Sequence, residues 1–464
     1  MDPSRYPKQI ERDFALRLNK NQKIQVERLV YELIKAKKMT YAGIVRSIGH
    51  DLREINPQGK DRFQHIKKTL VSLRYPVTCA RAAIDPNDLF LNKLKTAKKE
   101  AYHPGKCFTP KRVIVETQVK DSDLVTTIRR LFPKITIEFT EYYSRFLKDY
   151  RLTPHNLKQP LLFVVKEKWD FVKKCPCTKK HLGCGYWILN LGFGCPYDCS
   201  YCYLQHYQNF PGVVLPANID DFFATFDLFF KKIGRPIRIG TGEFCDSLAL
   251  DHITGYSRRL IDFFSQRPVL FELKTKSAHI ENILQQEPAG NIVISWSLNP
   301  RKIVDSEEYG VASLAQRLDA ARTVQKKGYK VAFHFDPIIY YDRWADDYRK
   351  LVEKLYQKVK PPLAWISLGT LRFARQLKPA MEQRFQQSNI VYGELFVGED
   401  KKLRYPEFLR IEIYRNMVKW IKRFDRKTPL YLCMESTTTW GQALMKVDAA
   451  SQVEKHLLKD NVKA

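Results

Sequence analysis

Three cysteines, Cys195, Cys199 and Cys202, stand in the string GFGCPYDCSYCYLQ with the spacing CxxxCxxC. Thiolates are the usual ligands of iron–sulfur clusters, and three of them can hold three irons of a cubane [4Fe-4S] cluster while the fourth iron keeps no protein ligand. A small chelating cosubstrate could bind that open iron. Two alternatives remain from the residues alone: a zinc site completed by a remote His or Cys, although zinc favours paired CxxC spacings, or thiols that only pack.

A second group, Cys175, Cys177, His181 and Cys184, has the spacing CxCxxxHxxC just before an apolar run. Thiolate and imidazole suit both zinc and an auxiliary iron–sulfur cluster, so the group is a candidate second metal site. The alternative is cysteines that pack near the base of a barrel. Six of the ten cysteines lie between Cys175 and Cys202, and such crowding favours metal ligation over disulfides in a reducing compartment.

The apolar run YWILNLGF directly precedes Cys195, so it predicts a strand with the three thiols on the loop after it. From Tyr186 to about residue 400, short apolar runs such as PIRIGTG, VLFELKT, IVISWSL, KVAFHF and LAWISLG alternate with helical stretches. This alternation is typical of parallel strands joined by helices, and about six units are fewer than the eight of a full barrel. The sequence therefore predicts an α/β fold with a partial (β/α)6 TIM-like barrel.

The first part of the chain has a different pattern. Residues 20–37 repeat apolar side chains at helical spacing, Thr40 suits the cap of a second helix, and residues 60–73 predict a third helix. We expect a small basic helical module here. It is either a nucleic-acid-binding unit of helix-turn-helix type or a plain packing unit.

A strand, helix, strand unit follows, predicted over residues 113–116, 121–132 and 135–139. The expected organisation is residues 1–108 (basic helical module), 109–184 (βαβ unit and cysteine-rich connection), 185–400 (partial barrel) and 401–464 (C-terminal region packed on the barrel).

Charge and hydropathy narrow the class of protein. Seventy-nine Lys and Arg stand against fifty Asp and Glu, a formal net charge of +29, and the basic residues are spread along the chain. A polyanion such as nucleic acid is the expected partner, and a solvated basic surface without a specific ligand is the alternative. No run approaches 18 apolar residues and the first residues are charged, so we expect a cytoplasmic protein with no membrane partner.

The motif CxxxCxxC after a first strand is similar to the hallmark of the radical S-adenosylmethionine (SAM) superfamily. The stretches CSYCYLQ, FELKTKSAHIENIL, SWSLNP and TLRFARQLKPAMEQRF further resemble the spore photoproduct lyase family, over roughly residues 109–420 and not over the helical module. The resemblance implies a barrel of radical SAM type in which SAM binds the open iron. It implies that one electron cleaves SAM to a 5′-deoxyadenosyl radical, which abstracts hydrogen from a thymine dimer-type lesion in DNA. A reductant of flavodoxin or ferredoxin type would supply the electron.

The same resemblance suggests which residues bind SAM. Gly242 and Glu243, in the string GTGE, resemble a motif that receives the SAM amine. Lys276 falls where the family has a lysine near SAM, and Ser297 and Asn299 are placed to meet the ribose hydroxyls. A surface charge at a strand end is the alternative for Glu243 and Lys276.

For the reaction itself, the resemblance points to Tyr201 and Tyr203 beside the last cluster cysteine, with packing around the cluster as the alternative. It also matches Arg372 to an arginine at the lesion. In the family a cysteine returns a hydrogen atom to the thymine radical, but an ungapped match of RIGTGEFCD puts Glu243 at that position. Cys245, two residues later, stays on the same face of an extended strand, so it is our candidate hydrogen donor, with a buried packing cysteine as the alternative.

Two other functions fit the residues. A radical SAM enzyme could modify an RNA or tRNA base, with the Cys175 group holding an auxiliary cluster. A non-catalytic iron–sulfur protein could bind DNA, with the cluster sensing redox state or stabilising the fold.

Overall fold

The computed structural model describes residues 2–55, 57, 61–95, 108–148, 150, 152–168, 171–178 and 181–458. By its internal contacts the chain divides into two compact units. The first combines Met1–Tyr102 with Arg372–Pro406, and the second combines His103–Leu371 with Glu407–Ala464. None of the helices in the described ranges is long and apolar enough to cross a membrane. The four-part division expected from the sequence stays a prediction.

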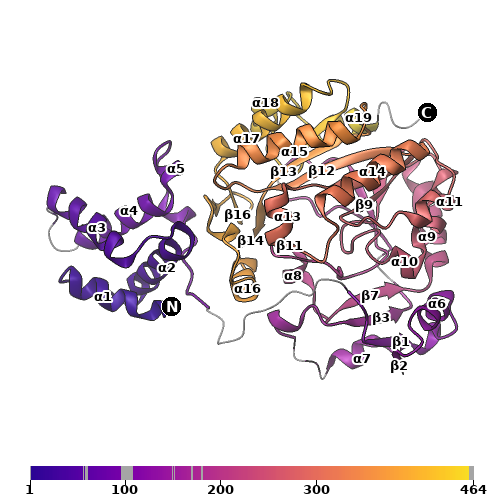
Figure 1. Ribbon diagram of the computed structural model, residues 1–464, viewed down its shortest axis with the longest axis horizontal. Coiled ribbons are helices and arrows are strands. Elements are labelled where there is room, and N and C mark those ends of the chain that lie inside the picture. Colours follow the sequence, from indigo (N-terminus) through magenta and orange to yellow (C-terminus); the bar gives the residue numbers. More distant parts are fainter. Residues whose placement is uncertain are drawn as a thin grey trace. The chain divides into compact units, whose positions relative to one another are not determined.

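The larger unit is built around a curled sheet with the strand order β17-β13-β12-β10-β9-β8-β5-β4. Figure 1 labels β13, β12 and β9 of this sheet. All neighbouring strands run parallel except the edge pair β4 and β5. The predicted partial barrel of six parallel strands is confirmed, and β17 adds a seventh. The strands are β4 (Val172–Lys174), β5 (Tyr186–Leu189), β8 (Arg238–Gly240), β9 (Leu270–Thr275), β10 (Ile292–Ser297), β12 (Lys330–Ile338), β13 (Ile366–Thr370) and β17 (Leu430–Leu432).

The barrel strands are almost continuously buried, as expected when helices cover one face of a parallel sheet and side chains fill the other. Helix α14 (Leu314–Lys327) shows how the sequence sets the bounds of a connecting helix. Ser313 and Gln316 form a capping box at its start, and Gly328, with φ +116°, ends it. The longer connecting helices are α9 (Ile219–Ile233), α11 (Tyr256–Ser265), α14 (Leu314–Lys327), α15 (Trp344–Lys358) and α17 (Glu407–Lys422), and the shorter ones include α10 (Asp251–Thr254), α12 (Glu281–Leu284), α13 (Arg301–Glu307), α18 (Thr437–Ala443) and α19 (Ala450–Leu458).

A second parallel sheet in the same unit has the order β2-β1-β3-β7. Its first two strands and the helix between them confirm the predicted βαβ unit. The fourth strand, β7, lies in the chain after the cysteine-rich loop. The elements are β1 (Arg112–Glu116), α6 (Asp123–Leu131), β2 (Thr136–Thr140), α7 (Tyr143–Lys148), β3 (Leu161–Val165), α8 (Leu204–Tyr207) and β7 (Val213–Pro216).

The smaller unit begins with the predicted helical module and also contains residues 372–406. Its helices are α1 (Tyr6–Asp13), α2 (Lys20–Lys37), α3 (Tyr41–Ile55), α4 (Asp61–Arg74) and α5 (Pro76–Cys79). Thr40 lies just before α3, as expected of a cap, and its hydroxyl accepts from Gly43 N at 3.1 Å. The later segment supplies β14 (Arg372–Ala374), α16 (Leu377–Arg384), β15 (Phe396–Val397) and β16 (Lys402–Arg404).

Candidate active site

The motif cysteines lie on the loop after β5, at the carboxyl end of the barrel sheet. A two-residue strand in this loop, β6 (Asp198–Cys199), pairs antiparallel with β11 (Glu308–Tyr309). The side-chain amide of Gln205 donates to the carbonyl oxygens of Cys199 and Cys202 at 3.3 and 3.2 Å, and Cys202 N donates to Cys199 O at 3.0 Å. These contacts within the protein fix the backbone around the thiols.

The start of the loop is held just as closely. Lys158 Nζ donates to Cys195 O at 2.6 Å. The preceding Gly194 has φ +77°, and a Cβ built there would lie 2.6 Å from the carbonyl oxygen of Gly212. Only glycine accommodates both the left-handed backbone and that close approach.

The chemistry of the three thiols suits a cluster. Burial raises the pKa of Cys195 and Cys199 well above the usual thiol value, although Lys158 and Lys276 act in the opposite direction, so buried thiolates here require a cation. Three thiols are the donor set of a cubane cluster that keeps one iron open, whereas a structural zinc site would need a fourth protein ligand.

Glu243, on the loop after β8, meets the cysteine loop through Tyr203. The Tyr203 hydroxyl donates to Glu243 O at 2.5 Å and to Glu243 Oε1 at 3.0 Å. Lys274 Nζ lies 3.6 Å from Glu243 Oε2, and Glu243 and Glu272 raise the pKa of Lys274 although burial opposes them. Lys274 is a site residue that the sequence reasoning missed, because a lysine in a strand resembles an ordinary surface charge.

Gly242 lets the second and third barrel strands come close. A Cβ built on Gly242 would lie 2.7 Å from Lys274 Cβ. Asp246, also missed from the sequence, ties the same loop to the end of β9: its carboxylate accepts from Thr275 Oγ1 at 2.6 Å and from Lys276 N at 2.7 Å.

Lys276 lies beside the cysteine loop. Its Nζ is 5.8 Å from the centre of the Tyr201 ring, and its charge counters the effect of burial on the pKa of the Cys199 thiol. The positive charge at this end of the barrel is therefore close to the site expected to hold a cluster.

Tyr201 belongs to a buried polar network. Its hydroxyl donates to Glu308 Oε1, and Asn299 Nδ2 donates to the same Glu308 oxygen at 3.0 Å. Arg317 Nη2 pairs with Glu308 Oε2 at 2.6 Å, and Tyr348 donates to Asn299 Oδ1 at 2.7 Å. Although burial opposes it, Arg317 lowers the pKa of Glu308 to about 2, together with Lys276. The Asn299 amide thus already has partners in the protein.

Ser297 and Cys245 complete the predicted set in this unit. Ser297, at the end of β10, is buried, and its carbonyl oxygen accepts from Arg317 Nη1 at 2.9 Å. Cys245 is half-buried, and burial with the nearby Asp246 raises its pKa to about 12. A Cβ built on Gly192 would lie 3.4 Å from Cys245 Cβ, so Cys245 is beside the start of the cysteine loop.

The structure therefore brings most of the predicted residues to one edge. The cysteine loop, Glu243, Lys276 and Ser297 follow or end β5, β8, β9 and β10, which are adjacent in the sheet. Arg372 lies in β14, within the smaller unit, opposite Arg404 in the antiparallel pairing. The roles assigned to these residues stay predictions.

The second cysteine group lies in the hairpin between β4 and β5. Cys177 N donates to Cys175 O at 2.7 Å, and the Cys177 side chain is the main cause that raises the pKa of Cys175. Burial raises the pKa of Cys184, and Cys177 adds to it. His181 shares the hairpin, where its amide donates to Thr178 O at 3.3 Å.

Comparisons with known proteins agree on one family. The family model described as spore photoproduct lyase matches residues 148–415, more than half of the chain. Spore photoproduct lyase from Geobacillus is 27% identical over 309 residues, covering 62% of this chain and 86% of the relative. The protein of the same name from Bacillus subtilis is 25% identical over 304 residues, covering 62% and 85%.

Solved structures show the same fold. A spore photoproduct lyase complexed with dinucleoside spore photoproduct superimposes with a TM-score of 0.62 at 23% identity, covering 70% of this chain and all of the other. A double mutant of spore photoproduct lyase with bound AdoMet and dinucleoside spore photoproduct gives the same TM-score, identity and coverage.

Proposed function

Because the chain belongs to the spore photoproduct lyase family, we propose that it is a radical SAM lyase that repairs a thymine dimer-type lesion in DNA. The observation that carries the proposal is the cysteine loop beside Glu243 and Lys276, at the carboxyl ends of adjacent barrel strands. Cys195, Cys199 and Cys202 would hold a [4Fe-4S] cluster and leave one iron open for SAM. When bound, the cluster supplies the electron that cleaves SAM to methionine and a 5′-deoxyadenosyl radical, which takes a hydrogen atom from the lesion.

The protein's own side chains would bind and orient SAM. Glu243 would receive the cationic amine of SAM, in place of its present long contact with Lys274. Gly242 would let the backbone approach, and Lys276 would offset negative charge near the thiolates. We assign Ser297 to the ribose hydroxyls, and Asn299 to the same region through its bonds to Tyr201 and Glu308.

Cys245 would return a hydrogen atom to the thymine radical that remains when the lesion splits. An electron from the reductant, of flavodoxin or ferredoxin type, and a proton from solvent would convert the resulting thiyl back to the thiol. Tyr203 lies between Glu243 and the loop and could relay a hydrogen atom, whereas the buried Tyr201 bond to Glu308 favours a positioning role. Arg372 would contact a phosphate or pyrimidine carbonyl of the lesion.

The test is anaerobic. The protein is reconstituted with iron and sulfide, reduced, and supplied with SAM and an oligonucleotide that carries the thymine spore lesion. We expect both 5′-deoxyadenosine and restored thymine, and we expect Cys245→Ala to lose thymine restoration while it still forms deoxyadenosine. Deoxyadenosine without restored thymine from the unmodified protein would contradict the lyase assignment and direct the search to RNA or tRNA bases. No deoxyadenosine from that protein would favour an iron–sulfur protein that only binds DNA.

We also propose that Cys175, Cys177 and Cys184, with His181 in the same hairpin, hold a second iron–sulfur cluster or a zinc ion. The hairpin supports this, because β4 and β5 pair on either side of the group and a Cβ built on Gly183, next to Cys184, would lie 3.4 Å from Cys177 Sγ. Iron and zinc are measured per chain before and after Cys184→Ser, with Cys79→Ser in the helical module as the control. Unchanged metal content in Cys184→Ser would overturn the second site. The high positive charge supports DNA as the partner, and we propose a cytoplasmic location.

A further inference from the structure

The helical module and residues 372–406 share one hydrophobic core. Phe396, in β15, is 8% exposed and belongs to the apolar cluster formed by the N-terminal helices. Its ring centre lies 4.6 Å from that of Tyr75, just after α4. Tyr392 packs edge-on against Tyr31 of α2, with ring centres 6.1 Å apart. The later segment is therefore part of the folded module.

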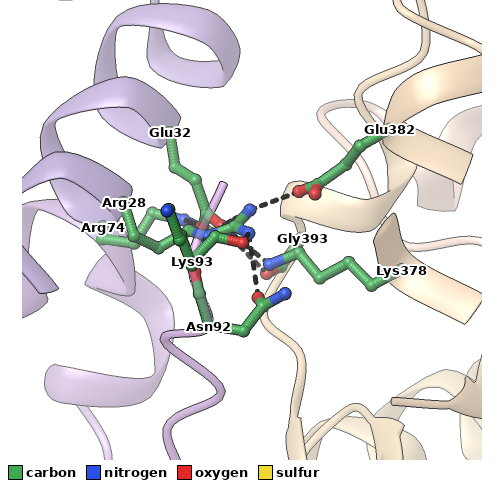
Figure 2. A network of polar contacts seen from close by, with 8 residues as sticks. All are labelled: Arg28, Glu32, Arg74, Asn92, Lys93, Lys378, Glu382 and Gly393. Atoms are coloured by element: carbon green, nitrogen blue, oxygen red, sulfur yellow. Dashed lines mark hydrogen bonds and ion pairs between the residues drawn. The ribbon is translucent and has the colours of Figure 1, made fainter. Parts of the chain in front are cut away.

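A buried cluster of charges joins the same two segments, with Glu32 of α2 at its centre (Figure 2). Arg74 Nε donates to Glu32 Oε2 at 2.6 Å, and Lys378 Nζ of α16 donates to Glu32 Oε1 at 2.7 Å. Arg28 Nη1 lies 3.5 Å from Glu32 Oε1. Although burial opposes them, these cations lower the pKa of Glu32 to about 2, so Glu32 is a carboxylate at neutral pH.

The outer contacts of the cluster also cross between the segments. Arg28 pairs with Glu382 of α16, and Arg74 Nη2 donates to Gly393 O at 3.2 Å. Glu394 accepts from Thr78 N at 3.2 Å and from Thr78 Oγ1 at 2.6 Å. Buried charges tolerate few arrangements, because each displaced partner leaves an uncompensated charge. The cluster therefore fixes the later segment on the helices in one position.

Strand register carries this position to Arg372. In the sheet β14-β16-β15, Phe396 is opposite Arg404, and Arg404 is opposite Arg372. Neighbouring strands lie about 4.8 Å apart, so Arg372 is two strands, roughly 10 Å, from the residue buried in the helical core. Movement of β15 on the helices would be passed directly to β14.

We propose that the N-terminal helical module is a positioning element for Arg372, and that Glu32 and Phe396 are its positioning residues. This inference rests on the proposed function, in which Arg372 contacts the lesion. The partner is a lesion-bearing DNA strand, and the module acts on it through the placement of one guanidinium rather than through its own basic surface.

The first experiment compares Glu32→Gln with Glu54→Gln, the same substitution at an exposed glutamate of α3. Hydrogen exchange of the peptide that contains residues 372–374 is expected to rise at least tenfold in Glu32→Gln and not in the control. The Kd for lesion DNA should rise about tenfold while deoxyadenosine formation without DNA stays unchanged. Unchanged exchange in both Glu32→Gln and Phe396→Ala would overturn the proposal.

The second experiment is a double-substitution cycle with Arg372→Ala. If the module acts through Arg372, then Glu32→Gln and Arg372→Ala each weaken lesion binding about tenfold and the double variant is no weaker than either. Multiplied effects of about a hundredfold would show that the module binds DNA by itself and would overturn the proposal. The variant Phe396→Leu keeps an apolar side chain in the helical core, so we expect it to bind lesion DNA nearly as well as the unmodified protein. It is the conservative control for Phe396→Ala.

These readouts also separate this inference from the proposed function. If the unmodified protein repairs no lesion, the lyase assignment fails. The exchange of residues 372–374 still reports whether the helical module holds β14 in place: faster exchange in Glu32→Gln or Phe396→Ala would retain the positioning, and unchanged exchange in both would reject it.

Discussion

Two carboxylates in this protein are surrounded very differently. The Glu32 side chain is fully buried and bonds two cations at 2.6 and 2.7 Å, with a third at 3.5 Å. The Glu243 side chain is 15% exposed, and its cation, Lys274, lies 3.6 Å away. Both oxygens of Glu32 bond buried cations, whereas Glu243 accepts one hydrogen bond from the neutral Tyr203 hydroxyl at 3.0 Å and has only a long contact with its cation. A charge that stabilises the fold is saturated by the protein, and the charge to which we assign the SAM amine is left partly unsatisfied.

The largest effect is expected on deoxyadenosine formation, when one of the three cysteines that would hold the cluster is removed. Cys202→Ala should abolish deoxyadenosine formation, because two thiolates do not retain a cluster with one open iron. The measurement is the chromatographic yield of deoxyadenosine after anaerobic reconstitution. Cys79→Ala, in the helical module, should keep the yield of the unmodified protein, and a full yield from Cys202→Ala would refute the cluster assignment.

Replacing Glu32 by glutamine should lower the free energy of unfolding of the smaller unit. Glu32→Gln removes the carboxylate that Arg28, Arg74 and Lys378 share, and breaking a buried pair costs about 3–5 kcal/mol. Urea denaturation followed by circular dichroism measures the change. The exposed Glu54→Gln should shift stability by about 0.5 kcal/mol or less. Equal shifts in the two variants would show that the Glu32 cluster does not stabilise this unit.

Acid should act on the same cluster. The pKa of Glu32 is about 2 in the folded protein, below its ordinary value of 4.5. A carboxyl group whose pKa is lowered by folding stabilises the protein above its unfolded pKa, and this contribution is lost as the pH falls towards the folded pKa. We expect the free energy of unfolding to fall by about 3 kcal/mol between roughly pH 5 and pH 2 because Glu32 becomes protonated. Glu32→Gln should lack this part of the acid sensitivity, and an unchanged pH profile in that variant would contradict it.

The smallest effect is expected for Glu243, and it is an effect on the affinity for SAM. Glu243→Gln should leave stability nearly unchanged but weaken SAM binding by about 1.5–3 kcal/mol, which is the usual contribution of a hydrogen bond to a charged group. Equilibrium binding of SAM to the reconstituted protein tests this, with the exposed Glu287→Gln as the matched control. Normal SAM affinity together with a large loss of stability would mean that Glu243 belongs with Glu32 as a structural charge.

The sequence predicted those features that depend on local pattern. Helix α2 occupies the predicted residues 20–37, and six barrel strands match six apolar runs, because both depend on the spacing of apolar side chains. The cysteine loop was identified from its spacing. Lys274 and Asp246 were missed, since their role depends on how β8 and β9 pair, and no local signal distinguishes them from ordinary strand-end charges.

The grouping of residues 372–406 with the N-terminal helices was beyond sequence reasoning for another reason. Lys378 meets Glu32 across almost the whole chain, and neither residue type nor spacing indicates such a distant partner. For Cys245 the sequence left two readings open. Its place beside Gly192 and the cluster loop supports the hydrogen donor, although the role itself stays a prediction.

The discontinuous smaller unit has a consequence for biosynthesis. Its helices α1–α5 leave the ribosome before α16 and β15, which follow only after roughly 300 further residues, and these take about 15–60 seconds at 5–20 residues per second. During that interval Glu32 lacks Lys378 and the apolar surface that Phe396 covers is open. A nascent chain is therefore exposed to misassembly and chaperone capture at its beginning until the barrel is almost complete, and a fragment ending before residue 372 is a poor substitute for the intact protein.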